Sequence, residues 1–131
     1  MIYLLDVNVL IALGFQFHSF HDRVALWLQA EGFPPIATCS ITELGFVRVL
    51  AQNPHYGLSV TQAVALLKQF KRGSTCEVVH VRDDHGAADL PGWVKTPKHI
   101  TDGHLLQLAS ARGLTLATLD EKIPGALVIP Q

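Results

Sequence analysis

Four acidic side chains stand out because each interrupts an apolar stretch of the chain. They are Asp6, Glu43, Asp102 and Asp120. Burying a carboxylate costs free energy unless its charge is compensated, so four such residues predict a shared cation. Oxygen ligands select a hard divalent ion, Mg²⁺ or Mn²⁺, over zinc or copper. Such an ion polarises a phosphoryl oxygen and activates water, which predicts phosphodiester hydrolysis without a covalent intermediate.

Sequence spacing indicates that these four acids meet at one edge of a parallel sheet. Glu43 and Asp102 each lie in the first turn of an expected helix, on its apolar face. Asp6 and Asp120 each follow an expected strand. In an open parallel sheet the strand carboxyl ends and the following helix N-termini share one edge, where ligands bind. Two polar residues are expected beside the acids: Asn8 and Thr118.

Each acid also has a purely structural interpretation. Asp6 could simply cap the first helix, and Glu43 could simply complete a Ser-x-x-Glu capping box that begins at Ser40. Asp102 could only complement a helix dipole, and Asp120 could only occupy a turn. The common site therefore rests on the four acids occurring together at one predicted edge.

Apolar strands alternate with helices along the chain, which is typical of an α/β fold. Strands are expected at residues 2–5, 36–38, 77–81, 114–119 and 126–129. Helices are expected at residues 7–13, 20–30, 40–52, 59–71 and 102–112, the last capped by Thr101, and residues 82–98 form a loop with one helical turn. This order predicts a single domain, residues 1–131, with a central parallel sheet of about five short strands covered by helices on both faces.

Composition narrows the class of protein. The chain has 131 residues, 49% of them hydrophobic, which excludes a disordered chain. Its net charge of −1 does not advertise a nucleic-acid binder, although a metal ion can supply positive charge at the point of contact. Two cysteines, Cys39 and Cys76, form neither a disulfide framework nor a zinc set, so a reducing, cytoplasmic compartment is expected. Neither a signal peptide nor a membrane span is expected.

Several other polar and aromatic residues could take part in function. His18 and His21 are expected at the surface, and His104 is expected to have a satisfied structural role near Asp102. The pair Asp83-Asp84 is expected in a solvated loop. Candidate RNA contacts are the exposed aromatic Trp93 and the basic residues Arg48, Arg112, Lys68, Lys71, Arg72, Lys95 and Lys98, most of which are expected to be ordinary solvated charges.

At its acidic motifs the chain resembles PIN-domain nucleases, in particular the VapC-type toxin ribonucleases of toxin–antitoxin pairs. The resemblance covers essentially the whole length. Its motifs are Leu-Leu-Asp-Val-Asn-Val-Leu at the start, Thr-Glu-Leu-Gly-Phe-Val-Arg-Val in the middle, and Ile-Thr-Asp-Gly-His-Leu-Leu-Gln-Leu-Ala with Leu-Ala-Thr-Leu-Asp near the end. The four acidic positions of the family fall on Asp6, Glu43, Asp102 and Asp120, and its supporting polar positions fall on Asn8 and Thr118.

The resemblance implies a PIN-like three-layer α/β/α fold and Mg²⁺- or Mn²⁺-dependent cleavage of single-stranded RNA. It also implies a homodimer and an antitoxin protein whose C-terminal segment covers the acidic groove. Asp120 departs from many relatives in being followed by Glu-Lys-Ile-Pro. The resemblance therefore supports Asp120 less than the other three acids.

Two alternatives remain open from the sequence. One is a non-catalytic RNA- or protein-binding module on the same fold, which would fail to bind Mn²⁺. The other is an aspartyl phosphotransferase that uses Asp6 as its nucleophile. That chemistry needs a lysine near the phosphate, and the chain offers no obvious lysine after a strand.

Overall fold

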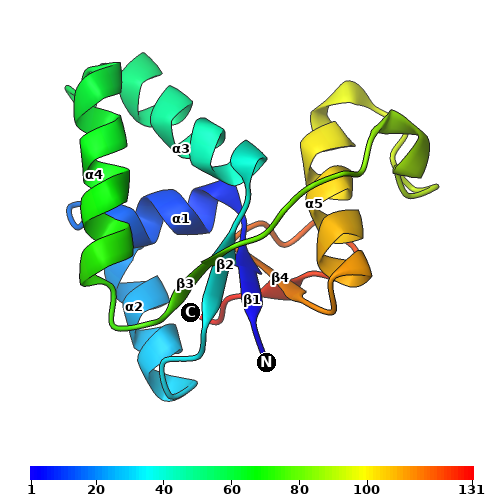
Figure 1. The fold of residues 1–131 in the computed structure, drawn as a ribbon, viewed down its shortest axis with the longest axis horizontal. Helices are drawn as coiled ribbons and strands as arrows, with labels where there is room; N and C mark the ends of the chain where they lie inside the picture. The colour runs from blue at the N-terminus through cyan, green and yellow to red at the C-terminus, as the bar shows by residue number, and fades with distance from the viewer.

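A computed structural model describes residues 1–131 and contains one five-stranded sheet. The strands are β1 (Tyr3–Leu5), β2 (Ile36–Thr38), β3 (Val78–His80), β4 (Thr115–Thr118) and β5 (Leu127–Val128). Their order across the sheet is β3-β2-β1-β4-β5, and every neighbouring pair is parallel. β1 therefore lies at the centre of the sheet (Figure 1).

Helices cover both faces of this sheet. They are α1 (Val7–Gly14), α2 (His21–Ala30), α3 (Ser40–Gln52), α4 (Val60–Gly73) and α5 (Ile100–Ala111), with short 3-10 helices η1 (Ala87–Asp89) and η2 (Pro97–His99). In Figure 1, α1 to α4 lie on one side of the strands and α5 lies on the other. None of the helices combines the length and the apolar character needed to span a bilayer.

The two hydrophobic cores follow from the pleat of β1. Tyr3 and Leu5 belong to the larger core, beneath α1 to α4, whereas Leu4 belongs to the smaller core, beneath α5. Successive side chains of a strand point to opposite faces, so a strand that is buried on both faces needs an unbroken apolar run. The predicted three-layer α/β/α fold is confirmed.

The predicted strands and α-helices all occur, in the predicted order, with boundaries that differ by at most two residues. The N-cap residues predicted for two of the helices are wrong. Cys39, not Ser40, precedes α3, and the N–H of Cys39 donates to Thr42 Oγ1 at 3.0 Å, so the capping box is shifted by one residue. Residue His99 precedes α5 without a side-chain cap, because η2 leads directly into the helix, so Thr101 is not its N-cap.

Candidate active site

Asp6 lies at the carboxyl end of the central strand and is 5% exposed. Its Oδ1 accepts a hydrogen bond from the Val7 N–H at 2.7 Å, so it does cap α1. Its Oδ2 accepts a hydrogen bond from Thr118 Oγ1 at 2.8 Å. Burial raises the pKa of Asp6; the two hydrogen bonds oppose this rise, and the charge of Asp120 adds to it. The ionised carboxylate is therefore held in place at an energetic cost.

Thr118 and Asn8 connect the ends of β1 and β4. The Asp120 N–H donates to Thr118 Oγ1 at 3.0 Å, and the Leu119 N–H donates to Asn8 Oδ1 at 3.3 Å. Asn8 Nδ2 also donates to Thr118 Oγ1, at 3.5 Å. Both predicted supporting residues thus hold Asp6 and the turn that carries Asp120 in one arrangement. Asp120 also has its structural role, because its Oδ1 accepts the Lys122 N–H at 2.9 Å.

Asp102 approaches the same edge from the first turn of α5 and is partly buried. Burial raises the pKa of its carboxyl, and the charges of Asp6 and Asp120 raise it further, against a smaller opposite effect of His99. Like charges disfavour the ionised form of each other. Asp6, Asp102 and Asp120 therefore form one electrostatic group, assembled from β1, α5 and the turn after β4.

Glu43 lies in the first turn of α3 and has its own partners. Its Oε2 accepts hydrogen bonds from Thr38 Oγ1 at 2.6 Å and from Lys71 Nζ at 2.7 Å, and His80 Nδ1 lies 3.2 Å from the same oxygen. Burial alone would raise the pKa of Glu43, but these hydrogen bonds and the charge of Lys71 lower it below its usual value. Glu43 therefore has a basic partner that stabilises its ionised form, whereas no basic side chain is bonded to the three aspartates.

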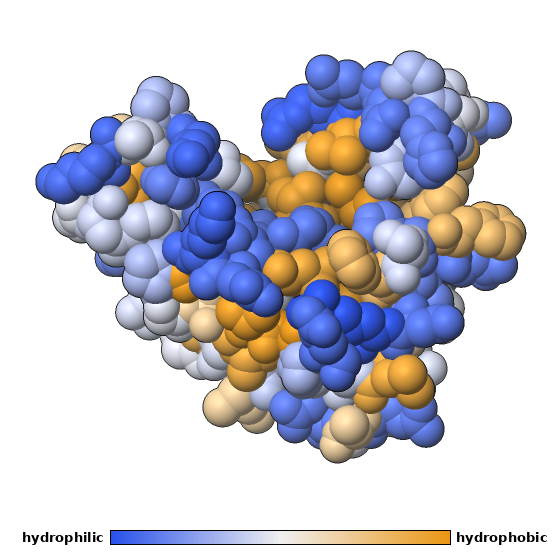
Figure 2. Space-filling view, turned by 180° about the vertical axis from the view of Figure 1, so that it is seen from behind, coloured by the Kyte–Doolittle hydropathy of each residue, from blue (hydrophilic) through white to orange (hydrophobic).

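The four acids lie along the carboxyl edge of the sheet, but they do not form a complete set of metal ligands. No three His, Cys, Asp or Glu side chains converge closely enough to hold a metal ion as they stand. The donor set nevertheless suits a hard divalent ion, because it consists of carboxylate oxygens whose mutual repulsion a cation would relieve. Figure 2 shows a hollow in the surface between the part formed by α5 with its preceding loop and the part formed by α3 and α4.

The predicted RNA-contact residues are scattered. Arg48 is exposed on α3. Arg112 follows the C-terminal end of α5, at the opposite end of that helix from Asp102, and donates to the Arg82 carbonyl at 2.9 Å. Trp93 is half-buried rather than exposed, since it packs against the smaller core and contacts the ring of His99.

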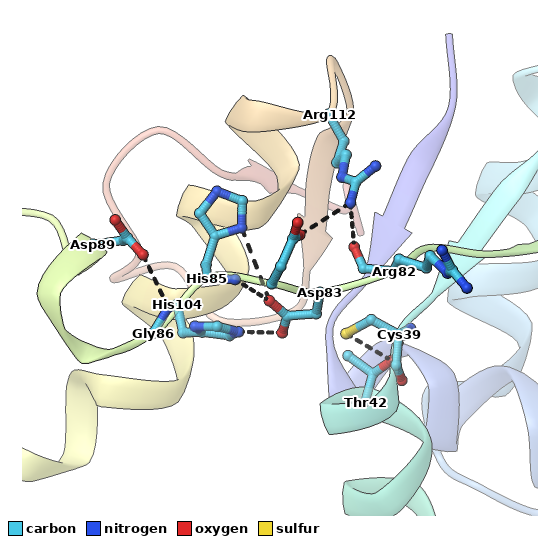
Figure 3. A network of polar contacts seen from close by, with 10 residues as sticks. Cys39, Thr42, Arg82, Asp83, His85, Gly86, Asp89, His104 and Arg112 are labelled. Atoms are coloured by element: carbon cyan, nitrogen blue, oxygen red, sulfur yellow. Dashed lines mark hydrogen bonds and ion pairs between the residues drawn. The ribbon is translucent and has the colours of Figure 1, made fainter.

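A polar network on the loop after β3 was missed by sequence reasoning. Asp83 and His104 are hydrogen-bonded, and their side chains are only 11% and 12% exposed (Figure 3). The His85 N–H also donates to Asp83 Oδ1, at 3.1 Å. The prediction of a solvated Asp83 is therefore wrong, whereas Asp84 is exposed as expected. His104 has the structural role predicted for it, because it fastens this loop to α5.

The pairing of Glu43 with Lys71 and His80 was also missed. Lys71 lies on α4 and His80 ends β3, so both are distant from Glu43 in sequence. No local spacing rule links them, and the sequence indicates Lys71 only as a possible RNA contact. The two histidines that were expected at the surface, His18 and His21, are partly buried. His21 Nδ1 lies 2.9 Å from the Ala12 carbonyl oxygen.

Comparison with known proteins identifies the family. A family model described as the PIN domain matches residues 3–126. Ribonuclease VapC38 of Mycobacterium tuberculosis is 36% identical over 124 residues, which cover 89% of this chain and 84% of that protein. Ribonuclease VapC44 of the same species is 36% identical over 135 residues, which cover 94% and 92% of the two chains.

Two solved structures share the fold. One is VapBC2 from Rickettsia felis bound to a DNA fragment from the promoter, with a TM-score of 0.63, 17% identity and coverage of 98% of this chain and 97% of that one. The other is Mycobacterium tuberculosis VapC20, described as a Sarcin-Ricin loop cleaving toxin, with a TM-score of 0.62, 13% identity and coverage of 98% and 99%. The chain belongs to the PIN-domain family and, within it, to the VapC ribonucleases.

Proposed function

We propose that this protein is a metal-dependent endoribonuclease and the toxin component of a toxin–antitoxin pair. The observation that carries the proposal is the group formed by Asp6, Asp102 and Asp120 in a chain of the VapC family. Burial and mutual repulsion raise the pKa of Asp6 and of Asp102, which is the condition that a bound divalent cation relieves.

The side chains have distinct roles in this proposal. Asp6, Asp102 and Asp120 hold Mg²⁺ or Mn²⁺, and Glu43 joins them from α3. When bound, the ion polarises a phosphoryl oxygen of the substrate and makes water a stronger nucleophile. Thr118 and Asn8 keep the Asp6 carboxylate oriented through the hydrogen bonds at the end of β4. The fixed orientation lowers the reorganisation needed when the substrate binds.

Single-stranded RNA is the proposed substrate, and the names of the relatives support an RNA substrate. Because the net charge is −1, the metal ion must supply much of the attraction for phosphate at the site. Among the predicted RNA contacts, Arg48 is exposed on α3, the helix that also carries Glu43, and is proposed to add to this attraction. Arg112 is engaged with Arg82 and Asp84 and is proposed only as a peripheral contact.

An antitoxin protein and a second copy of the chain are the proposed partners, in the cytoplasm. The solved VapBC2 structure supports an antitoxin partner by family. An apolar groove of about 640 Å³ between the end of α1 and α4 offers a surface for a protein partner, and Phe17 on its rim is 81% exposed. The two cysteines are free and buried, which suits a reducing compartment.

Cleavage of a random-sequence single-stranded RNA pool with Mn²⁺, and with EDTA instead, tests the proposal. We expect wild type to cut only with the metal, and Asp6→Asn and Asp102→Asn to lose at least about 100-fold in rate. Asp22→Asn is the matched control, because Asp22 is an exposed aspartate in the first turn of α2. Equal cleavage by all variants, or cleavage that persists in EDTA, would exclude this site as the metal-dependent centre.

A non-catalytic binding module is the second candidate, favoured by the absence of a finished ligand cage and by the pairing of Glu43. Calorimetric titration with Mn²⁺ separates the two, because a module without metal use shows no binding. Aspartyl phosphotransfer is disfavoured, since both carboxylate oxygens of Asp6 already accept hydrogen bonds and Lys71 contacts Glu43 instead. Incubation with acetyl phosphate should leave Asp6 unmodified.

A further inference from the structure

Lys71 of α4 and Glu43 of α3 form an ion pair beside the carboxyl end of β2. Lys71 Nζ lies 2.7 Å from Glu43 Oε2, and the two side chains are 32% and 20% exposed. Thr38 Oγ1 donates to the same oxygen from the end of β2. Lys71 is thus fixed by a specific contact and is not one of the solvated charges of α4.

The pair divides the four acids into two kinds. Burial and neighbouring carboxylates raise the pKa of Asp6 and of Asp102, and no basic side chain is bonded to Asp6, Asp102 or Asp120. Glu43 alone has an ammonium partner. A carboxylate that is already paired with an ammonium group is a weaker ligand, because a metal ion must compete with that group and is also repelled by it.

We infer that Lys71 is an intramolecular counter-ion that competes with the divalent cation for Glu43. The inference rests on the proposed metal site and adds a positioning residue to it. Before the cation binds, Lys71 neutralises Glu43 and holds it on the α4 side of the edge. When the cation binds, Glu43 exchanges the ammonium for the metal. Lys71 therefore sets how tightly the protein binds its metal ion.

The test is the affinity for Mn²⁺, measured by calorimetry without RNA. Lys71→Met keeps most of the side-chain stem and removes the charge, so we expect binding to tighten about two- to fivefold, the range of a partly exposed ion pair. Lys71→Arg should stay near wild type. Lys68→Met is the matched control, because Lys68 is an exposed lysine on the same helix with no ion pair.

A double-mutant cycle with Glu43→Gln separates two explanations. Lys71 could compete with the metal ion for Glu43, or its charge could simply repel the metal ion. If Lys71 acts through Glu43, the gain from Lys71→Met disappears in the Glu43→Gln background. A gain of equal size in both backgrounds overturns the inference, and so does unchanged or weaker binding by Lys71→Met. Should Lys71→Met fail to fold, Lys71→Gln is measured in its place.

Thermal melting gives a second readout that a merely structural pair would not produce. In EDTA, Lys71→Met should melt below wild type, because Glu43 is left uncompensated, and Mn²⁺ should raise its melting temperature more than that of wild type. An equal rise in both proteins contradicts the inference. Absence of Mn²⁺ binding by wild type would instead refute the proposed metal site itself, so the two failures are distinguishable.

Discussion

Replacing Asp102 by asparagine should stabilise the protein in EDTA while it abolishes cleavage. Asp102 is the cleanest position for this test, because its carboxylate makes no hydrogen bond whose loss would obscure the result, whereas Asp6 caps α1. The charges of Asp6 and Asp120 act against its ionised form. Asparagine is close to aspartate in size but removes that repulsion.

The expected gain follows from two opposing electrostatic effects. At an effective dielectric constant of about 20, two unit charges repel by about 4 kcal/mol at about 4 Å and by less at larger separations, and solvent screening at this partly exposed site reduces the value further. The dipole of α5 favours a carboxylate in its first turn by about 0.3–1 kcal/mol, which the substitution forfeits. The net gain is about 1 kcal/mol, or about 3–4 °C in melting temperature for a chain of this size.

The pH dependence of stability provides an independent check that Asp102→Asn stabilises the fold. Burial and neighbouring charge raise the pKa of Asp102 in the folded state, so the ionised carboxylate destabilises the fold and the protonated form does not. The advantage of Asp102→Asn is therefore full at neutral pH and shrinks as the pH falls toward about 3.9, the usual aspartate pKa.

Differential scanning calorimetry in EDTA, at neutral and at acidic pH, measures both effects. Asp22→Asn is the control: it also removes a first-turn carboxylate, but one on α2 rather than in the proposed site, and it should melt slightly lower than wild type. Saturating Mn²⁺ should raise the melting temperature of wild type and leave Asp102→Asn nearly unchanged. A fall in the melting temperature of Asp102→Asn in EDTA, equal to that of Asp22→Asn, would refute the crowded-charge account of this site.

Two further predictions concern the supports of the site. Thr118→Val should lower the free energy of unfolding by about 1–3 kcal/mol, because it leaves Asp6 Oδ2 without its buried donor. Urea titration measures this loss. A loss of the same size in a protein that also carries Asp6→Asn would contradict the explanation. Asp83→Asn should lower the melting temperature at neutral pH by more than the exposed control Asp84→Asn, because Asp83 is bonded to His104. In the folded protein His104 lowers the pKa of Asp83 despite burial. The stabilisation is therefore present above the usual aspartate pKa and is lost as the pH falls through the lower pKa of the folded state. A difference in melting temperature between the two variants that persists below that pKa would count against this explanation.

Local sequence patterns were sufficient for the elements of the fold. A short apolar run such as that of β1 is typical of a strand covered on both faces, and glycines such as Gly113, with a φ of 69°, end helices where other residues would be strained. The close packing of α5 against its preceding loop depends instead on tertiary structure. A Cβ on Gly103 would collide with Val94 Cγ2, a contact that no local pattern indicates.

Helix caps show where local reasoning fails even at short range. Ser40 and Glu43 match the pattern of a capping box, yet Thr42 takes that role with Cys39 as the preceding residue. Glu43 does not complete the capping box, because its carboxylate accepts hydrogen bonds from Thr38 and Lys71 instead. His80 also lies beside the same carboxylate. Those partners come from β2, α4 and β3.

The sequence by itself determined that Asp6, Asp102 and Asp120 would follow a strand or begin a helix, and strand–helix alternation then sends such positions to one edge of a parallel sheet. Only the tertiary structure decided how readily Asp6, Asp102 and Glu43 lose their protons. A carboxylate keeps or loses its charge according to which side chains fold against it, and these come from elements far away in the chain. For that reason burial and neighbouring acids raise the pKa of Asp6 and of Asp102, whereas hydrogen bonds from Lys71 and Thr38 lower the pKa of Glu43 despite its burial.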